Sequence, residues 1–180
     1  MAISVSVTGI EEVIEKLRTL PEKVAKPSFK KGLARAGSSG KTLGAKLITT
    51  VYKVSSGRVK RDINVKKSGD SLQIIFAGGV INLVNFNPSQ NKTGIRVTIK
   101  RGSPKIIKGA FKAGKFIAIR GTRSAGFHRN SPRLPITALS TVSVGTMAGN
   151  EGVIEPLVER VGEQFVKTVE AAIAFNLGKL

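Results

Sequence analysis

The side chain with the clearest capacity for chemistry is His128, the only histidine of the chain. Histidine is the usual general acid or base of proteins near neutral pH. Such catalysis needs a carboxylate that orients the imidazole, or a nucleophile beside it. Residues 71–150 contain no Asp or Glu, and no serine of the chain stands in a G-x-S-x-G motif. We therefore interpret His128 as a loop residue that stacks or hydrogen-bonds, and we predict that the protein is not an enzyme.

Metal and phosphate sites are equally poorly supported by the residue types. The chain has one histidine and no cysteine, and its only aspartates are Asp62 and Asp70. No D-x-D-x-D-G calcium loop occurs, and neither GAFKAG nor GDSLQIIFAGG continues into the GK[ST] of a phosphate-binding loop. The sequence therefore predicts no metal and no cofactor.

Positive charge is the strongest signal in the composition. Thirty Lys and Arg residues against eleven Asp and Glu residues give a formal net charge of +19. The acidic residues lie only before position 71 and after position 150, whereas residues 71–150 hold twelve cations. An ordinary solvated surface mixes both signs, so this segment is predicted to contact a polyanion or an acidic protein. The predicted contact residues are Lys100, Arg101, Lys105, Lys108, Lys112, Lys115, Arg120, Arg123, Arg129 and Arg133.

Sequence-specific reading of nucleic acid is not indicated. The chain shows no helix-turn-helix, zinc-finger or RNP pattern, and only 5% of its residues are aromatic. The start MAISVSVTGIEE does not have the pattern of a signal peptide, and no apolar run approaches the roughly 20 residues of a spanning helix. We expect no membrane partner.

Length and hydrophobic content predict one α+β domain over residues 1–180. Its expected parts are a helical region at 9–51, a β-rich region at 54–149, and a C-terminal helix at about 151–177. The amphipathic helices at the two ends should pack on a central, mainly antiparallel sheet.

The N-terminal region begins with an alternating pattern at residues 3–7 that predicts a short strand. Thr8 and Glu11 have the spacing of a capping box, and Pro21 should end the first helix or start the next. A second helix is predicted over residues 27–51, with cations on its outer face and glycines that allow close approach. The seam residues are Phe29, Leu33, Ala36, Gly40, Leu43 and Leu47, and the outer cations are Lys30, Lys31, Arg35, Lys41 and Lys46.

The middle of the chain alternates between β patterns and irregular segments. Residues 54–67 read as a polar break, and 72–86 as β structure with a turn or bulge at the Gly-Gly pair. Residues 94–100 and 115–121 alternate as strands with one wet, basic face. The segment between them, 101–115, is predicted to be a basic loop or a strand-edge arm. Residues 121–135 should be irregular at least in part, and LPITALSTVSVGTM, residues 134–147, should be extended.

The C-terminal helix has the most regular pattern. Asn150 could cap it, whereas Pro156 favours a start near Glu155, and Gly178 is a plausible stop. One side should carry a row of four glutamates that could contact the basic surface of a neighbouring copy in a ring. The predicted seam is Ile154, Val158, Val161, Phe165, Val169 and Ala172, and the acidic row is Glu151, Glu155, Glu159 and Glu163.

Two stretches together resemble the tail-completion proteins of phages, in particular the minor tail protein Z family. The first is VTGIEEVIEKLRTLPEKVAKPSFKKGLARAG, which is similar to the short strand, Gly and paired helices that open such proteins. The second resembles the family's Arg-rich β segment followed by an Arg, a Pro-Ile pair and a terminal Met. Its matching residues are Gly109-Ala110-Phe111, Lys115-Phe116-Ile117, Arg133, Pro135-Ile136, Ser143 and Met147.

The resemblance implies a structural role at the head–tail junction of a tailed phage. It implies a homo-oligomeric ring, a hexamer in that family, located in the virion after synthesis in the host cytoplasm. Other tail or neck proteins would be its neighbours, and genomic DNA could pass through the channel. Pro135, Ile136 and Met147 would then belong to the assembly geometry. The alternative from the residues alone is a stand-alone protein that binds nucleic acid without sequence specificity.

Overall fold

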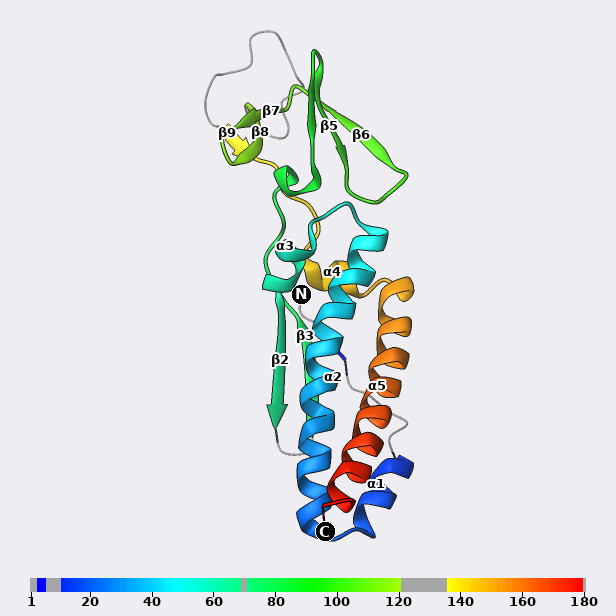
Figure 1. Ribbon diagram of the computed structural model, residues 1–180. Coiled ribbons are helices and arrows are strands. Elements are labelled where there is room, and N and C mark those ends of the chain that lie inside the picture. Colours follow the sequence, from blue (N-terminus) through cyan, green and yellow to red (C-terminus); the bar gives the residue numbers. More distant parts are fainter. Residues whose placement is uncertain (1–2, 6–10, 69–70, 121–135, 180) are drawn as a thin grey trace.

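The computed structural model describes residues 3–5, 11–68, 71–120 and 136–179 (Figure 1). The fold class is α+β, as predicted, and the paired strands of the described chain all run antiparallel. The molecule is elongated. We call the helical lower part the stalk (described residues 3–79 and 143–179) and the β-rich upper end the head (described residues 80–120 and 136–142).

Two long antiparallel helices form the stalk: α2, Glu22–Val51, and α5, Glu151–Leu177 (Figure 1). They form the most extensive contact between any two elements of the described chain. A short helix, α1, Glu11–Arg18, packs against them at the lower end through Val13 and Leu17. The predicted pairing of two amphipathic helices from opposite ends of the sequence is therefore the main feature of the fold.

The start of α2 lies five residues before the prediction. Pro21 precedes its first turn, and Pro27 lies inside the helix rather than at its first position. The proline pattern misplaced this boundary, because proline at the first helical position is a preference and not a requirement. In the first turn, a hydrogen bond from Lys26 lowers the pKa of the Glu22 carboxyl below its usual value.

Helix α2 is packed on two sides, and its glycines allow this. A β-carbon on Gly32 would lie 2.4 Å from Val169 of α5, and one on Gly40 would lie 2.3 Å from Ile74 of the adjoining sheet. The predicted close approach at the glycines is therefore confirmed. The single predicted seam was incomplete, since Ser28, Ala45 and Ile48 are also buried.

The stalk sheet has the order β1-β3-β2 and covers α2 (Figure 1). Its strands are β1, Ile3–Val5, β2, Ile63–Ser68, and β3, Ser71–Phe76. The polar break predicted at 54–67 was wrong. It holds a helix, α3, Ser56–Arg61, capped by the Ser55 hydroxyl, and then β2. Ile63 is buried and Val65 is half-buried while Asn64 and Lys66 between and after them are exposed, which is the alternation of a strand with one solvent-facing side.

The head consists of two three-stranded sheets and a 3-10 turn, η1, Leu83–Phe86. One sheet contains β4, Ser89–Asn91, β5, Gly94–Thr98, and β6, Pro104–Lys108. The other contains β7, Phe111–Ala113, β8, Phe116–Arg120, and β9, Ile136–Ala138. The strands predicted at 94–100 and 115–121 are confirmed, with Ile95, Val97 and Ile117 buried.

The basic segment 101–115 contains two edge strands, so the structure agrees with the predicted strand-edge arm and not with the loop. Strand β6 pairs with β5, and β7 pairs with β8. In β6 only Ile107 is half-buried and packs against the core, so the strand has a weak apolar pattern, as an edge strand often does. Of the extended pattern predicted at 134–147, the described part holds for β9 only, since Val144–Ala148 forms the short helix α4.

Helix α5 begins at Glu151, with the Asn150 side chain accepting a hydrogen bond from the Gly152 amide at 3.1 Å. Of the two predicted starts, the one capped by Asn150 is confirmed and the one near Glu155 is not. Gly178 ends the helix as predicted. The lower seam residues Val161, Phe165, Val169 and Ala172 are buried. The first two seam positions were wrong by one residue, because Val153 and Leu157 are buried where Ile154 and Val158 were expected.

Candidate polyanion and subunit interface

The predicted contact cations of the head are exposed wherever the structure describes them. Their positions follow the strand edges: the turn before β6, the strands β6 and β7, the β7–β8 turn and the end of β8. Arg123, Arg129 and Arg133, like His128 and Pro135, lie outside the described residues. The described and exposed set is Lys100, Arg101, Lys105, Lys108, Lys112, Lys115 and Arg120.

These cations do not form one flat patch. Successive side chains of a strand point to opposite faces, so Lys105 and Lys108 leave β6 on opposite sides. Lys108 shares its face with Arg96 of β5, which pairs with Ile106. Arg96 is exposed and was counted among the basic residues, yet it was left out of the predicted contact set. The head therefore presents positive charge on both faces of the edge strand.

Two arginines of the set also have contacts within the chain. The Arg101 Nε donates a hydrogen bond of 3.0 Å to the carbonyl of Thr49, near the end of α2. The Arg120 guanidinium lies 5.1 Å from the ring centre of Phe111, in cation–π geometry. Phe116 remains 40% exposed beside Lys115, so the head combines cations with accessible aromatic surface.

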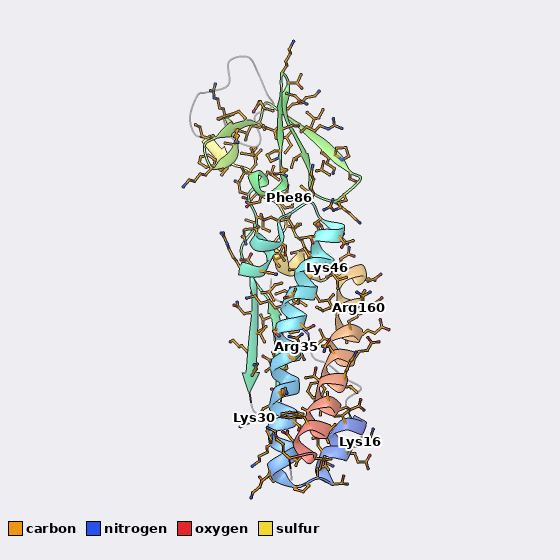
Figure 2. All side chains as sticks on the ribbon, in the orientation of Figure 1. Lys16, Lys30, Arg35, Lys46, Phe86 and Arg160 are labelled. Atoms are coloured by element: carbon orange, nitrogen blue, oxygen red, sulfur yellow. The ribbon has the colours of Figure 1, made fainter. Side chains whose placement is uncertain are left out.

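The stalk is basic along its length as well. Figure 2 shows Lys30, Arg35 and Lys46 at successive levels of α2, with Arg160 on α5 and Lys16 on α1. The outer face of cations predicted for α2 is largely confirmed, with Lys41 half-buried and the other four exposed.

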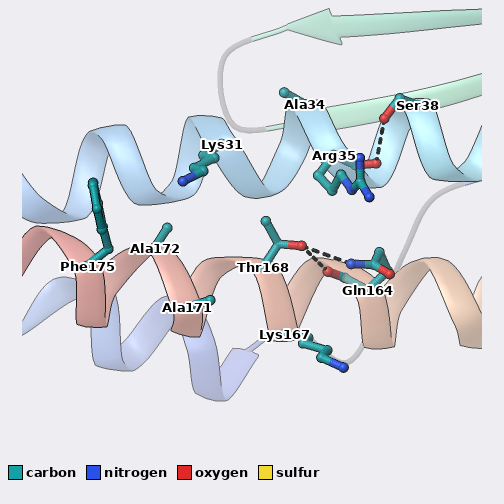
Figure 3. Close-up of a pocket in the computed structure, with 10 residues that line it drawn as sticks. All are labelled: Lys31, Ala34, Arg35, Ser38, Gln164, Lys167, Thr168, Ala171, Ala172 and Phe175. Carbon is teal, nitrogen blue, oxygen red and sulfur yellow. Dashed lines mark hydrogen bonds between the residues drawn. The ribbon is translucent and has the colours of Figure 1, made fainter.

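A groove of about 760 Å³ runs between α2 and α5 in the lower half of the stalk (Figure 3). We call it the stalk groove. Its cations are Lys31 and Arg35 of α2 and Lys167 of α5. Sequence reasoning did not find it, because its two walls come from opposite ends of the chain. The remaining lining residues are Ala34, Ser38, Gln164, Thr168, Ala171, Ala172 and Phe175.

The groove walls are held by short local contacts. Gln164 donates from Nε2 to the Thr168 hydroxyl at 3.1 Å, and that hydroxyl donates to the Gln164 carbonyl at 2.7 Å. Phe175 is 56% exposed and lies under two ammonium groups, with Lys31 at 5.3 Å and Lys179 at 4.3 Å from its ring centre. Small alanines beside cations leave room for a chain segment that is apolar on one side and acidic on the other.

The acidic row of α5 is exposed as predicted. Among the residues that the structure describes, none of its four members forms an ion pair. Other described carboxylates do so: Glu170 lies 3.8 Å from Lys16, and Asp62 lies 2.8 Å from Arg58. Glu15 of α1 is exposed and has no ion pair among these residues either, but the row is where four such carboxylates follow one another: Glu151, Glu155, Glu159 and Glu163.

Two residues predicted to serve assembly have different surroundings. Ile136 of β9 is 43% exposed, so it is accessible to a neighbour. Met147 is fully buried in α4, where it packs in the hydrophobic core. Met147 thus fills a gap inside its own chain and is not exposed to a neighbouring subunit.

The described residues contain no group of three or more His, Cys, Asp or Glu side chains placed to hold a metal ion. Within the same residues, no helix has the length and apolar character needed to cross a membrane. No protein-family model matches the chain, and neither a curated protein nor a solved structure is significantly similar to it.

Proposed function

We propose that the protein is a structural component of a tailed phage virion, of the tail-completion type, that assembles as a ring at the head–tail junction. Its basic head would contact DNA in the channel or an acidic neighbouring ring. The observation that carries the proposal is the exposed cationic head, built from a segment of 80 residues without one carboxylate. Such a surface attracts phosphates and acidic proteins through charge and reads no bases.

The elongated stalk supports an assembling role. Charges of both signs are exposed along it, including four glutamates without an ion pair among the described residues, which suits contacts between subunits. The resemblance to tail-completion proteins supplies the particular setting, at the junction between capsid and tail.

The test is a pair of charge-matched variants. In the head variant, Ser replaces four lysines of the head: Lys105, Lys108, Lys112 and Lys115. In the control variant, Ser replaces four lysines that are exposed on the stalk outside the groove: Lys23, Lys30, Lys46 and Lys66. Both lower the formal net charge by four, so only the location differs.

The head variant should lose binding to double-stranded DNA or to an acidic tail protein, while the control keeps it. Circular dichroism should show that both remain folded. If DNA is the partner, the slope of log K against log salt should become shallower by up to about 3.6 in the head variant. Equal binding by the two variants would place the contact elsewhere.

A stand-alone, non-specific nucleic-acid-binding protein is the second candidate. The exposed Phe116 beside Lys115 favours it, because bases stack on accessible aromatic rings next to cations. Light scattering separates the two candidates. A monomer that binds single-stranded DNA tightly supports the second, whereas a defined oligomer, alone or with a tail protein, supports the first.

A further inference from the structure

We propose that the stalk groove binds the acidic row of α5 from a second copy of this chain, in a head-to-tail contact. The inference deepens the proposed function, on which it rests, by naming the surfaces through which subunits would join. Each copy would present its acidic row to one neighbour and its groove to the other.

The two surfaces lie on different flanks of α5. At about 100° per residue, the groove side chains Gln164, Lys167, Thr168 and Ala171 centre roughly 150° around the helix from the four glutamates. The row also lies in the first half of α5 and the groove in the second half. Glu163 is the exception, since it lines a smaller hollow with Gln164 and Lys167 of its own copy. Glu151, Glu155 and Glu159 cannot reach the groove of their own copy, so their pairing with a groove must be between molecules.

The lengths of the two surfaces agree. From Glu151 to Glu163 the helix rises about 18 Å, and the α5 wall of the groove, from Gln164 to Phe175, rises about 16 Å. A helical segment of this length can lie along the groove with its small and apolar side against the alanines. Ile154 and Val158 pack against the core of their own copy but remain partly exposed, and together with the half-buried Gly162 they supply such a side.

The charges are complementary. The groove offers Lys31, Arg35 and Lys167, and the row offers glutamates that have no ion pair among the described residues. Copies with a formal charge of +19 repel one another at long range, but at about 0.15 M salt this repulsion is screened beyond roughly 8 Å. Local contacts between the row and the groove persist at that ionic strength, so the association should be measured there.

The contact is heterologous, because two different surfaces meet. Such a contact repeats until it closes a ring, or it continues as an open filament if the rotation between copies does not close. A ring agrees with the proposed function. A filament of the purified chain would support the contact and would count against the ring.

The experiment is a charge swap. Variant A carries Lys31→Glu, Arg35→Glu and Lys167→Glu in the groove, and variant B carries Glu151→Lys, Glu155→Lys and Glu159→Lys in the row. Alone, each variant brings like charges together at every contact, and its self-association should fall at least about a hundredfold. Mixed in equal amounts, A and B again pair opposite charges at both of their contacts, so alternating assemblies should form. Sedimentation velocity at physiological salt reports the sizes.

Three outcomes would overturn the inference. The first is a wild-type chain that stays monomeric at millimolar concentration. The second is self-association of variant A or B equal to wild type. The third is a mixture of A and B that stays monomeric although both variants retain the wild-type circular dichroism spectrum. Loss of DNA binding in variant A without loss of self-association would assign the groove to a polyanion instead.

The head variant with four serines separates this inference from the proposed function. It should assemble as wild type does, because its substitutions lie outside both stalk surfaces. Suppose that wild type assembles through the stalk and that the head variant binds DNA or the tail protein as wild type does. The subunit contact would then be retained, and the proposed role of the head would be rejected.

Discussion

The Arg101 guanidinium of the head lies against the carbonyl of Thr49, near the end of the stalk helix α2, with a hydrogen bond of 3.0 Å from Nε. The last turn of α2 contains no basic residue of its own. Arg101 therefore supplies, from another part of the chain, the positive charge that stabilises a helix C-terminus. Backbone hydrogen bonds from Arg101 to Val51 and from Lys53 to Ile99 join the same two parts. One of the predicted polyanion contacts is thus also a structural link between head and stalk.

Replacing Arg101 with Ala should lower the free energy of unfolding by about 1 kcal/mol, because a charged hydrogen bond and the cation at the helix end are both lost. Urea unfolding followed by circular dichroism measures the change. Lys100→Ala is the matched control, since Lys100 is equally basic, adjacent and exposed. Similar stability of the two variants would show that the link contributes little.

Gly40→Ala should destabilise the stalk by about 1–3 kcal/mol, because the new methyl group would overlap Ile74 and press on Val161. Helix propensity alone predicts the opposite, a gain of about 1 kcal/mol. Gly57 of α3 is the control, since a β-carbon there meets no atom within 4 Å. Thermal unfolding should show a lower midpoint for Gly40→Ala and an unchanged or higher one for Gly57→Ala.

The Gly-Gly pair after β3 offers an adjacent comparison. Gly78 has φ +145°, and a β-carbon on it would lie 2.4 Å from the Asp62 carboxylate, whereas one on Gly79 meets nothing within 4 Å. Gly78→Ala should therefore cost about 2 kcal/mol or more of stability, and Gly79→Ala less than about 0.5 kcal/mol. Chemical denaturation of the two variants checks this, and equal costs would place the strain elsewhere.

The chain has no cysteine, so disulfide trapping can test the subunit contact directly. A mixture of the single variants Arg35→Cys and Glu155→Cys should form a covalent dimer on mild oxidation, because the proposed contact brings these positions close. Neither variant should do so to the same extent alone. Lys46→Cys mixed with Glu155→Cys is the control, since Lys46 is exposed on α2 but outside the groove. Equal yields from both mixtures would indicate random collision.

The sequence by itself determined the elements whose signals are local. The intervals of Val161, Phe165 and Val169 predicted one buried face, and the caps at Asn150 and Gly178 matched the ends of α5. The alternation of Ile95 and Val97 predicted a strand with one wet face in the same way. These predictions succeeded because side-chain periodicity and capping act within a few residues of the backbone.

Only the tertiary structure decided which distant residues meet. Lys31 and Lys167 line one groove, Arg101 reaches Thr49, and the two strands of the Lys-rich segment 101–115 pair with β5 and β8. Met147, for which the family resemblance implied a part in assembly, is buried by the packing of α4. Such contacts depend on how whole helices and strands pack, and the free energy of that packing is distributed over many residues far apart in the chain.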